Sequence, residues 1–66
     1  MQNGNVKWFD LARGIGVIEP DEGDDVHVEL DTVLKAGRRT LEEGQLVVFD
    51  LGYARGRTVA DNLCVL

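Results

Sequence analysis

Short apolar runs alternate along the chain with breaks of Gly, Asp and Pro, at a spacing of about ten residues. This pattern predicts short strands and no long helix, because strands span only a few residues and end at turn-forming residues. Pro20 is expected to end the second strand, since proline has no backbone N–H to donate to a neighbouring strand. We expect five strands, over residues 5–10, 14–19, 25–30, 45–51 and 57–65.

The connections between these strands differ in length. Residues 21–24 and residues 52–56 have the composition of turns. Between the third and fourth strands, residues 31–34 are expected to form one helical turn capped by Asp31, followed by a loop over residues 35–44. Five strands with one long connection predict an all-β fold, a five-stranded antiparallel Greek-key barrel of the OB-fold type, in a single domain over residues 1–66.

Period-two alternation assigns each residue of the central strands to a face. In residues 25–30, valine and leucine alternate with polar residues, so one side of this strand belongs to the aliphatic core. Strict alternation in the first strand turns Trp8 inward together with Val6. The polar side of the third strand and the adjacent second strand are expected to form a mixed outer patch of Ile15, Val17, His27 and Glu29.

The charge balance limits the partners of the chain. A net charge of −5 weakens the long-range attraction to phosphate backbones, so a nucleic-acid site would need a concentrated local group of basic residues. Charged residues make up 29% of the chain, which argues against a membrane span. The acidic run at residues 21–25 lacks the spacing of a calcium-binding loop and is expected to be a solvated turn.

Cys64 is the only cysteine, so the chain has no internal disulfide. It lies in the apolar run 63–66 and is expected to be a small buried hydrophobic residue. No secretory signal follows Met1, and we therefore expect a cytoplasmic protein. We expect no metal and no cofactor, because the chain offers Cys64 no partner ligands.

Five segments occur in a fixed order and spacing: GNVKWF at 4–9, RGIGVI at 13–18, DVHVEL at 25–30, TLEEGQ at 40–45 and ADNL at 60–63. On these segments the chain resembles the bacterial cold-shock domain family over nearly its whole length. The resemblance implies an OB barrel whose outer face binds single-stranded RNA or DNA by stacking bases on aromatic rings, in the manner of an RNA chaperone. It assigns the nucleic-acid-binding role to Lys7, Trp8, Phe9, Arg13, Ile15, Val17, Asp25, His27, Leu30 and Arg38.

The chain departs from the family at the aromatic residues that stack on bases. Aliphatic or basic residues replace the aromatic residues that the family has at positions 15, 17, 30 and 38. If each loss costs about 1 kcal/mol, binding is weakened roughly a thousandfold, to micromolar or weaker. Glu29 replaces a family histidine and Asp10 an asparagine, and both add negative charge. Arg55 and Arg57 in the last turn are expected to offset this acidity.

Two other functions compete with nucleic-acid binding. Ile15, Val17 and Leu30 would form an exposed apolar patch suited to a protein partner or a homodimer, unless Leu30 turns inward with the core valines. His27 and Glu29 lie two residues apart and could hydrogen-bond as an acid/base pair. No nucleophile, ligand set or deep pocket accompanies them, so we expect a binding module and not an enzyme.

Overall fold

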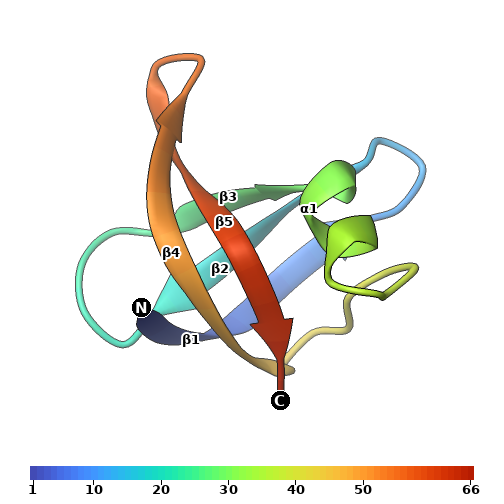
Figure 1. Ribbon diagram of the computed structural model, residues 1–66, viewed down its shortest axis with the longest axis horizontal. Coiled ribbons are helices and arrows are strands. Elements are labelled where there is room, and N and C mark those ends of the chain that lie inside the picture. The colour runs from blue at the N-terminus through green and yellow to red at the C-terminus, as the bar shows by residue number, and fades with distance from the viewer.

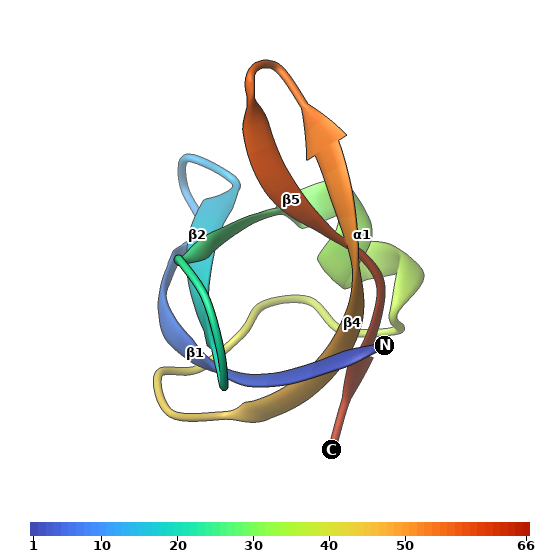
Figure 2. The ribbon, with the colours of Figure 1, turned by 90° about the vertical axis from the view of Figure 1, so that its left-hand side faces the viewer.

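The computed structural model describes residues 1–66 as a closed barrel of five strands (Figure 1). The elements are β1 (Gln2–Asp10), β2 (Ile15–Pro20), β3 (Val26–Glu29), α1 (Leu30–Lys35), β4 (Leu46–Ala54) and β5 (Arg57–Val65). The strands follow one another around the barrel in the order β1-β2-β3-β5-β4, and Figure 2 shows them as a ring. All neighbours are antiparallel except β3 and β5, which meet in parallel at His27 and Val59. The predicted fold class is therefore confirmed.

The core is mostly aliphatic and lies inside the ring of strands. Alternate residues of each strand point into it, as the period of two requires. Phe49 of β4 is its largest side chain and is fully buried, while Val33 of α1 and Leu41 of the following loop close one side. The ten buried members are Val6, Ile18, Val26, Val28, Val33, Leu41, Val47, Phe49, Ala60 and Leu63.

The helix differs from the prediction at its start. It begins at Leu30 and not at residue 31, its N-cap is Glu29, and no side chain caps it. The predicted cap at Asp31 is therefore wrong. The reason is tertiary: the Leu30 N–H donates to the Gly14 carbonyl, and the Leu30 side chain packs against the core.

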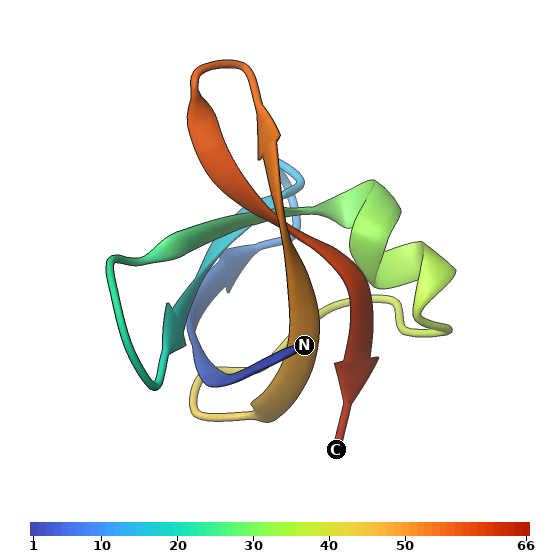
Figure 3. The same cartoon turned by 60° about the vertical axis from the view of Figure 1, so that its left-hand side comes forward.

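The β4–β5 hairpin is longer than predicted and projects from the barrel (Figure 3). β4 continues to Ala54, so the predicted turn over residues 52–56 shrinks to Arg55 and Gly56. Both residues have positive φ angles, 53° and 77°, which suit the tight turns that join twisted strands. Leu51 follows Val47 and Phe49 in the alternation but is half exposed, because β4 pairs with β1 only as far as Phe49 and with β5 alone beyond it.

Cys64 is exposed, so its predicted burial is wrong. Its neighbour Leu63 enters the core, and alternation along β5 turns the next side chain to the outside. The apolar run at the end of the chain is thus a strand with two faces. β1, β2 and β3 also shift at their ends relative to the predicted strands, while β5 agrees with the predicted range.

Candidate nucleic-acid interface

A β-bulge at Lys7 sets the direction of Trp8. Val6 lies opposite Ile18 and Trp8 lies opposite Val17. β1 therefore advances by two residues over a stretch in which β2 advances by one. Lys7 is the extra residue, and the side chains after it change face. Val6 is therefore fully buried while Trp8 is 40% exposed. The inward orientation expected from strict alternation is wrong.

Trp8 belongs to a row of three residues across the barrel surface. It lies opposite Val17 of β2, which in turn lies opposite His27 of β3. Neighbouring strands are about 4.8 Å apart, so the two rings stand on backbones roughly 10 Å from each other. We call the outward side of β1–β3 the outer face. It consists of this row and the next one, Asp10, Ile15 and Glu29.

Val17 forms the floor of the outer face between the two rings. It is only 7% exposed, yet it is not part of the core cluster inside the barrel. Ile15 and Leu30 are half-buried, and Leu30 packs against the core. The predicted exposed apolar patch of these three residues is therefore not present, and Leu30 turns inward.

Lys7 and Asp25, both assigned to nucleic-acid binding, pair with each other. The Lys7 Nζ of β1 donates at 2.9 Å to a carboxylate oxygen of Asp25, the residue directly before β3. This hydrogen bond, together with the charge of Asp25, raises the pKa of Lys7 above its ordinary value. A phosphate that approaches Lys7 therefore has to compete with Asp25.

Glu29 pairs with Arg55 at the tip of the β4–β5 hairpin. The hydrogen bond expected between His27 and Glu29 is not formed, and the Nδ1 atom of His27 is buried without a hydrogen-bond partner. The expectation that the last turn offsets the acidity of this face is confirmed for Arg55. The arginine reaches Glu29 because the hairpin tip lies beside β3, where both line a common hollow.

The remaining predicted residues lie around the outer face or below it. Phe9 is half-buried, packs against the core and lies over Gly16. Arg13 is exposed in the turn between β1 and β2, where its backbone N–H donates to the Asp10 carboxylate at 3.2 Å. Arg38 is exposed after α1 and forms no ion pair. The binding roles of these residues stay predictions.

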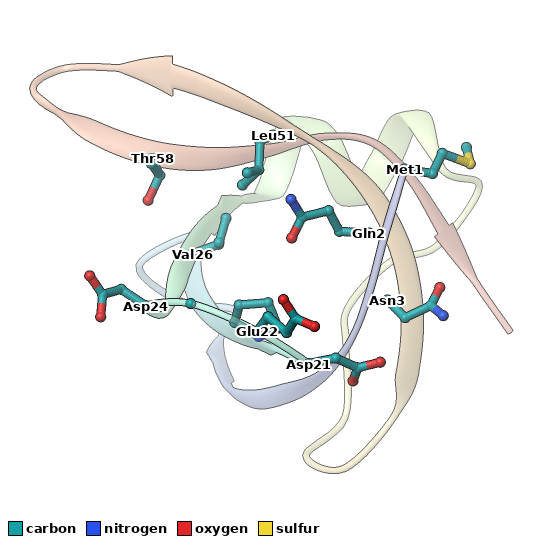
Figure 4. A pocket seen from close by; sticks show the side chains of 11 residues that line it. Met1, Gln2, Asn3, Asp21, Glu22, Asp24, Val26, Leu51 and Thr58 are labelled. Atoms are coloured by element: carbon teal, nitrogen blue, oxygen red, sulfur yellow. The ribbon is translucent and has the colours of Figure 1, made fainter.

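The largest hollow of the molecule, about 740 Å³, contains no residue of the outer face (Figure 4). It lies between the start of β1, the acidic turn after β2 and the β4–β5 hairpin. The carboxylates of Asp21, Glu22 and Asp24 line it, which disfavours a phosphate there. No group of three acidic, His or Cys side chains could hold a metal ion. No helix has the length and apolarity needed to span a membrane.

Sequence reasoning missed the position of the hairpin tip beside the outer face. The local signal was present, because alternation continues past residue 51 and Arg55-Gly56 is a plausible two-residue turn. Its contact with β3 had no local signal, since Glu29 and Arg55 are 26 residues apart in the chain.

Comparison with known proteins agrees with this geometry. Residues 2–66 match the family described as 'Cold-shock' DNA-binding domain. The chain is 46% identical to cold shock protein CspA of Rhizobium meliloti (strain 1021) in an alignment 66 positions long, and the alignment covers 96% of each chain. It is 44% identical to cold shock protein CspC of Bacillus subtilis (strain 168) over 62 residues, which covers 92% of this chain and 94% of the relative. The chain therefore belongs to the cold-shock domain family, a family of nucleic-acid-binding modules.

Proposed function

We propose that the chain binds single-stranded RNA or DNA weakly through the outer face, without catalysis, as an RNA-chaperone-like module. The observation that carries this proposal is the bulge at Lys7, which turns Trp8 out of the core and into a row with His27. An exposed tryptophan on a strand surface is a platform for a nucleobase, and such stacking tolerates any base. A cytoplasmic location belongs to the same proposal.

The neighbours of Trp8 suggest how a strand would lie. One base stacks on Trp8 and a second on the smaller ring of His27, with Val17 beneath the step between them. When a strand binds, the Lys7 ammonium leaves Asp25 and neutralises a phosphate of the strand. The freed Asp25 carboxylate then accepts a hydrogen bond from a base. We expect an affinity in the micromolar range or weaker for two reasons. This face offers two rings, whereas the family has more aromatic residues there, and Asp10 and Glu29 add negative charge.

The test is a titration of tryptophan fluorescence with heptathymidine and with the matching RNA strand, at low and at moderate salt. Trp8 is the only tryptophan, so quenching reports on this position alone. We expect saturable quenching that weakens as salt rises, because phosphate neutralisation releases counterions. A duplex of the same length is the control and should quench far less. A flat signal into the high micromolar range would contradict the proposal.

Self-association or a protein partner at Ile15, Val17 and Leu30 is the competing function. It has less support, because these three side chains are buried or half-buried. Sedimentation of the wild type and of Ile15→Glu distinguishes the two. A monomer at all concentrations favours the nucleic-acid function, and a dimer that Ile15→Glu dissociates favours the alternative.

A further inference from the structure

The ion pair between Glu29 and Arg55 joins the outer face to the β4–β5 hairpin. Both side chains are solvent-exposed, 41% for Glu29 and 75% for Arg55. Exposed ion pairs of this kind stabilise a fold by only about 0–1 kcal/mol. Another anion can therefore replace the carboxylate of Glu29 at little cost to the fold.

A small hollow of about 70 Å³ lies beneath this ion pair, between β3 and the hairpin. His27 and Glu29 line it from β3, and Arg55 and Arg57 line it from the two sides of the turn. His27 also belongs to the row of Trp8 and Val17, so the hollow is continuous with the outer face. The Nδ1 atom of His27 is buried without a hydrogen-bond partner.

The charges around the hollow favour an anion. Arg55 and Arg57 contribute two positive charges and Glu29 one negative charge, which leaves one positive charge with His27 neutral. Arg57 forms no ion pair, whereas Lys7, next to Trp8, is already held by Asp25. A guanidinium binds phosphate through two parallel hydrogen bonds, as it does a carboxylate, so the two anions are interchangeable partners.

We propose that Arg55 and Arg57 bind a backbone phosphate of the single strand, and that the Glu29 carboxylate occupies Arg55 until this phosphate replaces it. This inference rests on the proposed function and extends its interface from β1–β3 onto the hairpin. The strand would leave the His27 position across the hollow and place one phosphate between the two arginines. Glu29 is then an internal competitor for the ligand, and it weakens binding by more than its charge alone.

The decisive comparison is Arg55→Gln made in a Glu29→Gln background. If Arg55 only neutralises Glu29, removing Arg55 has no effect once Glu29 is gone. If Arg55 binds phosphate, Glu29→Gln raises the affinity for heptathymidine, and adding Arg55→Gln lowers it again by threefold or more. The slope of log affinity against log salt should also fall, by at most about 0.7, the value for one phosphate contact on a single strand, because the two arginines share one phosphate. Arg57→Gln in the wild type should also lower the affinity and the slope, the slope again by at most about 0.7.

Matched controls separate this site from general charge effects. Lys35→Gln removes one positive charge at the end of α1, and Glu22→Gln removes one negative charge in the acidic turn; neither residue lines the hollow. Of the five altered side chains, four are exposed and Glu29 is partly exposed. Equal thermal midpoints confirm that the variants fold. The arginine variants should lose at least twice as much affinity as Lys35→Gln.

The ligand group is tested with a strand whose linkages are uncharged methylphosphonates. The difference in affinity between Glu29→Gln and Glu29→Gln/Arg55→Gln should vanish with this uncharged strand. If the difference persists, the phosphate assignment is overturned. If Trp8 is quenched but the arginine variants match Lys35→Gln, the inference fails and the proposed function stands. If no strand quenches Trp8 in any variant, the proposed function itself fails.

Discussion

The ring of Phe9 lies over Gly16 so closely that a methyl group at position 16 would stand 2.5 Å from the Phe9 Cδ1 atom. The carbonyl oxygen of Trp8 would lie 2.6 Å from the same methyl group. β1 and β2 therefore approach each other over a residue without a side chain, directly beside the tryptophan of the outer face. This contact links the stability of the barrel to the position of Trp8.

Gly16→Ala should destabilise the barrel by about 1–3 kcal/mol, because the backbone of β1 must move to admit the methyl group. Urea unfolding followed by Trp8 fluorescence measures the change. Gly52→Ala is the control: its methyl group would meet side chains and no backbone, namely the end of the exposed Asp61 side chain, which can rotate away, and the Val59 Cγ2 atom at 3.3 Å. Equal stability of the two variants would contradict the close approach of Phe9 to Gly16.

Trp8→Ala should weaken binding of heptathymidine by about 1–3 kcal/mol, the contribution of one stacked base, and change stability little. Trp8→Phe keeps a ring and should retain most of the affinity. Fluorescence anisotropy of a labelled strand measures both variants, since neither contains a tryptophan. If Trp8→Ala binds as well as the wild type, Trp8 is not a stacking platform.

Val17→Phe should raise the affinity by roughly fivefold or more, because it adds a ring to the floor between Trp8 and His27. Val17 lies outside the core cluster, so the larger side chain can extend toward solvent without displacing core residues. Leu46→Phe places the same ring on an exposed part of β4 away from the outer face and should leave the affinity unchanged. The same titration of Trp8 reports on both variants.

Asn62 supports the irregular pairing of β4 and β5 in two ways. It adopts a positive φ of 49°, and its side-chain amide donates to the Asp50 carboxylate at 2.9 Å. Asn62→Gly should lose only the hydrogen bond, whereas Asn62→Ala also strains the backbone and should be less stable than Asn62→Gly by about 1 kcal/mol. Thermal unfolding at neutral pH ranks the two variants, and the reverse order would exclude backbone strain at this position.

The same contact predicts a pH dependence. The hydrogen bond from Asn62 lowers the pKa of Asp50, so the ionised carboxylate is favoured in the folded state. This stabilisation is present above the ordinary pKa of an aspartate, about 3.9, and is lost as the pH falls through the lower folded-state value. The difference in stability between wild type and Asn62→Gly should therefore be constant near neutral pH and shrink in acid. A difference that grows below pH ~4 would contradict this assignment.

Part of the candidate site followed from the motifs, and part did not. The resemblance placed Trp8 on the surface, and the structure agrees, although alternation from Val6 predicted the opposite. It also assigned Lys7 and Asp25 to one interface, and the two residues do meet there. The sequence indicated that Arg55 and Arg57 offset the acidity of this face, but not that they lie beside His27, because that placement depends on how far the hairpin projects.

The sequence by itself determined the number and order of the strands and the mostly aliphatic core, and β5 agrees with its predicted range. These features depend on alternation and on turn-forming residues, which act over a few neighbouring positions. Only the tertiary structure decided the bulge at Lys7, the inward turn of Leu30 and the pair between Glu29 and Arg55. Each of these depends on the register or approach of segments that are distant in the chain, and the energy that selects them arises only when those segments pack.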